Sequence, residues 1–180
     1  MVATVTLRSE HGGTAGAPAG GSQTTVAVGG TIRFKRADND TVNTVNPMVI
    51  PTSGENFSWR KNIHLSFDTA PAAQITDLRF IVTNTSVPSG FKMWAAQIAP
   101  SAYDVATSAD EAANVSPTVD VTAGTTMSII SGTVVTNAST VPGFGDVTQN
   151  LILMQMSALS TATTTGTISG FTLTWRFDEV

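Results

Sequence analysis

The sequence contains no cysteine, which excludes disulfide bonds, thiolate metal sites and catalysis by a thiol. Charged residues are also scarce: they make up 12% of the 180 residues, whereas an average soluble domain has about 25%. Threonine, serine, alanine, glycine and valine take their place. A low charge together with 41% hydrophobic residues suits a protein that lies against other protein surfaces.

The chain also lacks long apolar and long basic runs. No apolar stretch approaches the ~20 residues of a membrane-spanning helix, and the opening sequence MVATVTLRSEHGG lacks the basic and apolar regions of a signal peptide. The formal net charge is −4, and no basic run is longer than the pairs Lys35-Arg36 and Arg60-Lys61. We therefore expect neither a membrane span nor a nucleic-acid interface.

What the sequence does contain is strand-like alternation, most clearly in FSWRKNIHLSF, residues 57–67. Apolar residues two or four positions apart alternate with polar ones, which predicts a β-strand with one apolar and one solvent-facing side. Lys61 interrupts the apolar row, and His64 falls on the polar side. Residues 75–84 and 170–177 are similar runs, and the three together predict the core of the fold.

Nine or ten short strands separated by turn residues predict an all-β fold, an antiparallel β-sandwich of jelly-roll type, in one domain spanning residues 1–180. Residues 24–28 and 31–36 flank Gly29-Gly30 and are expected to form a hairpin. Two prolines bracket residues 48–50, so this segment is expected to be an edge or a bridging loop. We expect at most one short helix, beginning at the capping-box sequence of residues 108–111, with an irregular loop as the alternative.

The segment LILMQM, residues 151–156, is apolar on both faces. It predicts either a central strand covered on both sides or a strand that meets a partner subunit. Together with Met127 it offers more apolar surface than one sheet face can cover, and large apolar patches are rare on monomers. We therefore expect a homo-oligomer, with a trimer as the first hypothesis.

Candidate sites for metal or phosphate chemistry are few. Asp38-Asn39-Asp40 offers closely spaced oxygen ligands, but it lacks the glycine and the distant glutamate of an EF-hand, so a simple turn is the favoured interpretation. His11 and His64 are the only histidines, too few for a histidine metal site. The glycine pairs at 12–13 and 20–21 lack the lysine and the strand–helix context of a phosphate-binding loop.

The carboxylates are scattered over predicted strand ends and loops, with no evident pair of the kind that a glycosidase needs: Asp68, Asp77, Asp104, Asp146, Asp178 and Glu179. Trp59, Trp94 and Trp175 could form a sugar-stacking platform, although their places on apolar strand faces favour the core. We expect no enzymatic activity, and we assign no catalytic, cofactor-binding or metal-binding residue.

Three stretches resemble segments of virion structural proteins of tailed bacteriophages: residues 32–61, IRFKRADNDTVNTVNPMVIPTSGENFSWRK; residues 75–95, ITDLRFIVTNTSVPSGFKMWA; and the end of the chain, FTLTWRFDEV. The resemblance implies a non-enzymatic sandwich protein of the virion, assembled in the host cytoplasm. Its leading form is a capsid decoration (cement) protein that contacts the major capsid protein and stabilises the shell. A head–tail joining or tail protein is an alternative within this class, and a carbohydrate-binding module is the alternative from another class.

Residues 11–22 are rich in glycine and alanine and contain no large apolar side chain. Such a segment cannot bury enough surface to offset its ordering entropy, so we expect it to be flexible. Residues 2–7 before it alternate like a strand. We therefore expect a tethered strand that pairs with the sheet of a neighbouring subunit.

Overall fold

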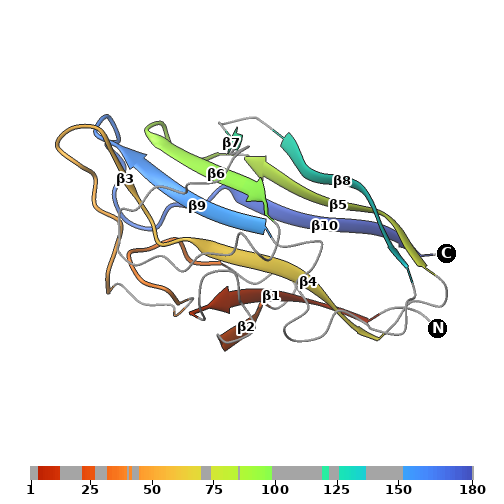
Figure 1. Ribbon diagram of the computed structural model, residues 1–180. Helices are drawn as coiled ribbons and strands as arrows, with labels where there is room; N and C mark the ends of the chain where they lie inside the picture. The colour runs from red at the N-terminus through yellow and green to blue at the C-terminus, as the bar shows by residue number, and fades with distance from the viewer. Residues whose placement is uncertain are drawn as a thin grey trace.

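The structure is a computed structural model of the chain, and it describes residues 4–12, 22–26, 32–39, 41, 45–69, 74–84, 86–98, 119–121, 126–136 and 152–179. These residues form ten β-strands and no helix (Figure 1). Every pair of neighbouring strands is antiparallel. The predicted all-β, antiparallel class is therefore confirmed, while the expected short helix at 108–111 lies outside the described residues.

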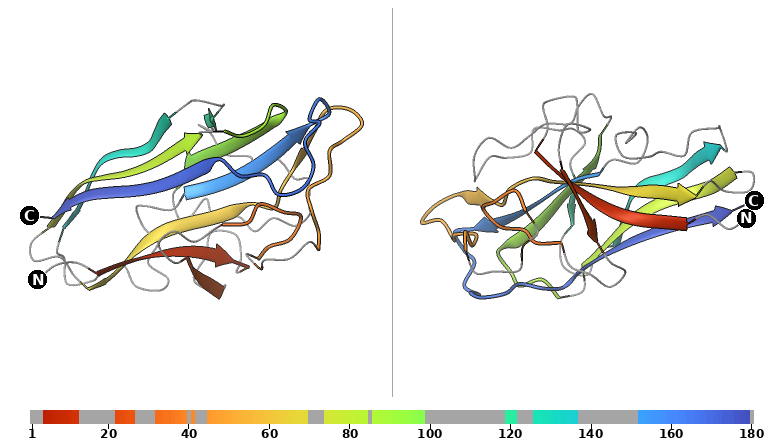
Figure 2. Two further views of the ribbon diagram at one scale, coloured as in Figure 1. Left: turned by 180° about the vertical axis from the view of Figure 1, so that it is seen from behind. Right: turned by 90° about the horizontal axis from the view of Figure 1, so that it is seen from below.

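The strands form two sheets, seen from further directions in Figure 2. The larger has the order β2-β1-β4-β9-β6-β7, and β3 also pairs with β9. Its strands are β1 (Thr4–His11), β2 (Ser22–Val26), β3 (Glu55–Phe57), β4 (Lys61–Thr69), β6 (Phe91–Gln97), β7 (Val119–Val121) and β9 (Ile152–Leu159). The smaller has the order β10-β5-β8, formed by β5 (Gln74–Asn84), β8 (Thr126–Thr136) and β10 (Phe171–Glu179).

Both sheets contribute to one cluster of buried side chains. From the smaller sheet, Phe80 is fully buried, and Trp175 packs against it at a ring-centroid distance of 4.8 Å. The partners from the larger sheet and the adjoining turn are Ile63, Met93, Ala95, Ile152, Met154, Met156 and Val87. Burying a side chain of this size stabilises the fold by about 1.5–3 kcal/mol, so this cluster holds the two sheets together.

Strand β9 is the predicted central strand. It lies between β4 and β6, and its residues 152–158 are all buried. Because this one chain covers both faces of residues 152–156, the central-strand alternative accounts for their apolar character. The homo-oligomer stays a prediction.

The predicted strand over residues 57–67 is interrupted. β3 and β4 both pair with β9, but the chain advances four residues from Phe57 to Lys61 while β9 advances three, from Met154 to Ser157. This extra residue is a β-bulge, and it reverses which face each side chain takes. Phe57 and Ile63 therefore lie on opposite faces of the sheet, contrary to the single apolar row expected from the sequence.

The solvent-facing side expected for this strand is also wrong. Residues 61–65 are buried throughout, with Asn62 only 4% and His64 only 1% exposed. Polar and apolar residues alternate here, but both faces of this part of the sheet are buried, so the alternation does not mark a solvent-facing side.

The N-terminal strand belongs to its own sheet. β1 pairs with β2 on one side and with β4 on the other, so that Leu7 lies opposite both Val26 and Leu65. The expected tethered strand for a neighbouring subunit is therefore wrong for residues 4–7. The expected hairpin is wrong as well, because β2 pairs with β1 and residues 32–36 form no strand. Residues 13–21, most of the glycine-rich segment, and Gly29-Gly30 lie outside the described residues.

Three connections meet at one end of the molecule, at the left of Figure 1: residues 45–54, the turn at 86–90 and residues 160–170. The amide of Ser160 donates to the carbonyl of Gly54 at 3.0 Å, and the amide of Leu159 donates to that of Gly90 at 2.8 Å. We call this the loop end. β1 begins and β10 ends at the opposite end of the molecule (Figure 1). The proline-bracketed segment 47–51 is irregular, as expected.

Candidate functional site

A turn that includes Asp38, Asn39 and Thr41 is held by two buried lysines. The Nζ of Lys61 donates to the carbonyl of Asn39 at 2.9 Å, and the Nζ of Lys35 donates to the carbonyl of Thr41 at 3.0 Å. Lys61 is fully buried and Lys35 is 7% exposed. Hydrogen bonds from charged donors are about twice as strong as neutral ones, so these ammonium groups hold the turn against β4.

Asp38 of this turn binds the residue that follows β1. Asp38 accepts a hydrogen bond from the amide of Gly12 at 2.9 Å, and Asn39 accepts one from the amide of Thr41 at 3.1 Å. The second contact is the Asx turn that such residues favour. The interpretation of Asp38-Asn39 as a turn therefore agrees with the geometry; Asp40 lies outside the described residues.

Five of the nine basic residues of the chain lie in two short segments, 33–36 and 60–61. The structure brings these segments together, because the amide of Trp59 donates to the carbonyl of Lys35 at 2.7 Å. Sequence reasoning treated the two basic pairs separately and missed this concentration of charge. The repeated basic pair, each preceded by an aromatic residue, was the available signal.

The bulge beside this turn is held by side-chain contacts to β9. The hydroxyl of Ser58 accepts a hydrogen bond from the amide of Met156 at 3.0 Å, and the side-chain amide of Gln155 donates to the Ser58 carbonyl at 2.8 Å. Both side chains are buried. These bonds replace the ladder contacts that the extra residue interrupts, so they keep the bulge and its flanking basic residues in place.

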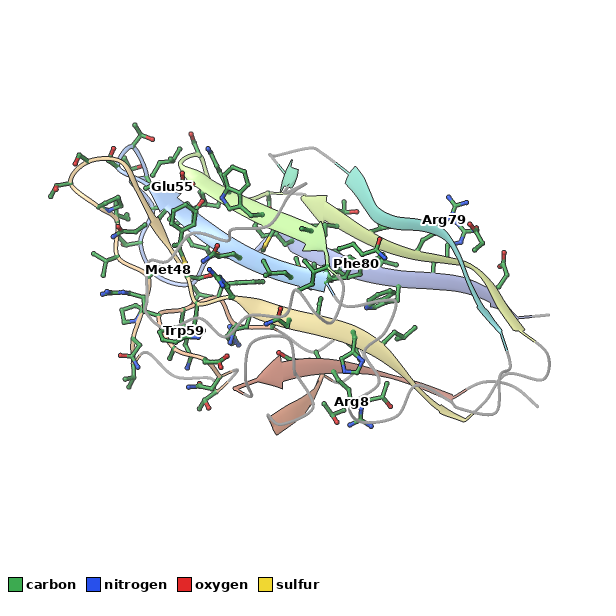
Figure 3. The ribbon with its side chains drawn as sticks, viewed as in Figure 1. Arg8, Met48, Glu55, Trp59, Arg79 and Phe80 are labelled. Carbon is green, nitrogen blue, oxygen red and sulfur yellow. The ribbon has the colours of Figure 1, made fainter. Side chains whose placement is uncertain are left out.

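A second polar group lies on the face of β9 that also carries the Gln155 side chain. The indole N–H of Trp94 donates to the hydroxyl of Ser157 at 2.9 Å, and this hydroxyl donates to the carboxylate of Glu55. The ammonium group of Lys92 lies 5.1 Å from the centre of the Trp94 ring, within range of a cation–π interaction. Glu55 lies toward the loop end (Figure 3). Trp94 is thus a fixed, half-buried aromatic rather than a core residue.

The smaller sheet carries a charged group on its outer face. Arg79 and Asp77 form an ion pair of 2.8 Å between Nε and Oδ1, with side chains 42% and 35% exposed. The hydrogen bond to Asp77, and then its charge, raise the pKa of Arg79 above the ordinary value. Asp77 has a φ of 53° at a point where β5 contains one more residue than β10. Figure 3 places Arg79 far from Met48 and Trp59.

The other candidate residues are dispersed. His64 is buried opposite Arg8 in the β1–β4 pair, and Trp59 is half-buried near the pinned turn. Asp178 is exposed on β10. The side chains of His11, Asp68 and Glu179, and the whole of Asp104 and Asp146, lie outside what the structure describes. Among the described residues, no three His, Asp or Glu side chains are placed to share a metal ion.

The fold and these groups define an all-β protein of two antiparallel sheets with a lysine-pinned turn. The described part of the chain contains no helix with the length and hydrophobicity of a membrane span. Comparison of the chain with protein-family models, with curated proteins and with solved structures gives no match.

Proposed function

We propose that this chain is a non-enzymatic virion structural protein of a tailed bacteriophage, built as a jelly-roll β-sandwich. Its role is that of a capsid decoration protein, which stabilises the shell through contacts with the major capsid protein. It is located in the virion after assembly in the host cytoplasm.

The order of the strands carries this proposal. β4, β5 and β6 follow one another in the chain yet lie in alternating sheets, and so do β7, β8 and β9. β9 then returns to lie between β4 and β6. Jelly rolls, which build viral capsid and lectin domains, also have two packed antiparallel sheets whose successive strands alternate between the sheets, so this strand order supports the proposal.

The segment that resembles phage structural proteins adds support. Residues 32–61 contain the turn pinned by Lys35 and Lys61, and they continue into the loop end. There Val45 and Val49 are 60% and 46% exposed, the large apolar side chains that the described surface leaves in solvent. Apolar side chains held on an anchored loop suit contact with another protein.

The test uses particles of a phage that encodes this chain, prepared without it. The purified protein should co-sediment with these particles and raise the temperature at which the shell opens. Exchanging Val45 and Val49 together for serine should weaken binding while leaving the melting temperature of the free protein unchanged, because both side chains are exposed. Thr163→Ala, at another exposed position of the loop end, is the matched control. Absence of wild-type binding, with unchanged shell stability, would refute the proposal.

Electron microscopy of the bound particles separates the alternatives within this class. Density on the shell supports a decoration protein, whereas density at the neck or tail identifies a joining or tail protein. The carbohydrate-binding alternative is favoured by one observation, the half-buried ring of Trp94 that Ser157 holds in place. Glycan binding that is lost in Trp94→Ala, without particle binding, would establish that function instead.

A further inference from the structure

Strand β10 is an edge strand within the described part of the fold. It is the first strand in the order β10-β5-β8, and among the described strands only β5 pairs with it. In the view from below it forms the outer margin of the smaller sheet (Figure 2). With nine residues it is longer than the usual strand of about 5–6 residues. An edge strand of this length can add a strand from another chain.

The two faces of β10 restrict how a second strand can pair with it. Phe171, Leu173 and Trp175 point toward the core and pack against it. The residues that alternate with them are exposed: Thr172, Thr174, Arg176 and Asp178. A second copy of β10 must keep its core-facing side chains on the same side of the extended sheet. Only registers that place exposed positions opposite exposed positions meet this condition.

Among these registers, one matches the charges. An antiparallel pair centred on Phe177 places Arg176 opposite Asp178 of the second copy, and Asp178 opposite Arg176 of the second copy. A pair centred on Arg176 places two arginines face to face, and pairs centred on Trp175 or Thr174 leave Arg176 opposite a threonine. Opposite charges across strands contribute about 0.2–1 kcal/mol each, and like charges are destabilising. The sequence Arg-Phe-Asp is therefore self-complementary in an antiparallel pair.

Within the smaller sheet, Arg176 faces a residue of like charge. Arg176 lies directly opposite Arg79 of β5, a juxtaposition of like charges. Arg79 forms an ion pair with Asp77, and the charge of Asp178 on β10 acts on Arg79 as well. A departure from the usual pairing rule at an exposed position points to a role beyond the single chain.

We propose that β10 pairs with β10 of a second copy about a twofold axis at Phe177, which joins the two smaller sheets into one. The partner is another molecule of this chain, and two Arg176–Asp178 contacts set the register. The inference extends the proposed function by naming a partner, but its test requires only the isolated protein. The competing interpretation is that Arg176 and Asp178 are charges that keep an edge strand from pairing.

Charge exchange tests the register. Wild-type protein should show a dimer by light scattering, dissociating on dilution and at high salt. Arg176→Asp and Asp178→Arg should each reduce dimerisation about tenfold or more, and the double exchange should restore it. Both positions are exposed, so thermal melting should show folded protein throughout. A monomeric wild type at every concentration, or a dimer that neither single exchange weakens, would overturn the proposal.

Cysteine cross-linking provides a second measurement. Because the chain has no natural cysteine, only the introduced cysteines can form a disulfide. Facing residues on antiparallel strands have Cα atoms about 4.5–5.5 Å apart, which a disulfide can span. In a mixture of Arg176→Cys and Asp178→Cys proteins, the two cysteines face each other while one Arg176–Asp178 contact remains. Oxidation should cross-link the mixture several-fold more than either variant alone. Equal cross-linking in all three samples would exclude this register. Particle binding by a protein that stays monomeric would refute the dimer while leaving the decoration role intact.

Discussion

Replacing Gly90 with alanine should destabilise the fold through two separable effects. Gly90 has a φ of 88°, a conformation that costs an L-residue about 1–2 kcal/mol. An added Cβ would lie 2.5 Å from the Cα of Ala162, and this backbone would have to move. Forced overpacking costs about 1–3 kcal/mol. The sum is about 2–5 kcal/mol, which lowers the melting temperature of a protein of this size by about 4–20 °C.

Gly166→Ala is the matched control. Gly166 has a φ of 95°, but no atom lies within 4 Å of the added Cβ. It therefore reports the backbone strain alone, and the gain from a less flexible unfolded chain is the same in both variants. The difference between the two variants measures the contact with Ala162. Adding Ala162→Gly to Gly90→Ala should recover only part of the loss, since the backbone atoms of residue 162 remain.

Urea denaturation followed by tryptophan fluorescence measures these differences. The midpoint should fall in the order wild type, Gly166→Ala, Gly90→Ala, while the slope with denaturant stays constant, as expected when only stability changes. If Gly90→Ala is within about 0.5 kcal/mol of Gly166→Ala, the close packing of the turn at 86–90 against residues 160–170 is not what holds the loop end together.

Three further substitutions test the core, the pinned turn and the bulge in β5. Trp175→Ala should cost about 3 kcal/mol, since the indole packs against Phe80; an unchanged melting temperature would contradict this role. Lys61→Met should lower the free energy of unfolding by about 1–3 kcal/mol, because the Asn39 carbonyl loses its donor. If urea denaturation shows a more stable variant, the desolvation cost of the buried ammonium group exceeds the energy of its hydrogen bonds. Asp77→Val should cost about 1–3 kcal/mol because a branched residue cannot readily take a φ of 53°, whereas calorimetry should place Asp77→Gly close to wild type.

The central strands could be predicted from the sequence because their signal is local. The apolar density of β9 indicated burial on both faces, and alternation indicated β5 and β10. The bulge between β3 and β4 could not be predicted in this way. It depends on a bond between Ser58 and the amide of Met156, 98 positions further along the chain. A one-residue insertion changes the face of every later side chain, so a correct strand was assigned with wrong faces.

The partner of β1 was missed for a related reason. Alternation in residues 2–7 identifies a strand but says nothing about which strand lies beside it. The glycine-rich residues that follow suggested a tether, and the strand was assigned to a neighbour. In the structure, Leu7 completes the row formed by Leu65 and Val26. Likewise, the lysines that pin the turn at 38–41 act on a segment up to 22 positions away in sequence, which no motif records.

The charged residues of the smaller sheet and the loop end lie at opposite ends of the molecule. Arg79 lies near one end, and Met48 and Glu55 lie near the other (Figure 3). A dimer formed through β10 about Phe177 would therefore hold two loop ends apart, each carrying Val45 and Val49. Such a dimer can bind two neighbouring sites of a repeating shell, and linked binding exceeds single-site affinity by about 10²–10⁴-fold. Arg176→Asp should reduce particle affinity by a factor in this range although position 176 lies beside Arg79, away from the loop end. Adding Asp178→Arg should restore the affinity. Equal affinities for the monomeric and dimeric proteins in a sedimentation assay would show that each copy binds on its own.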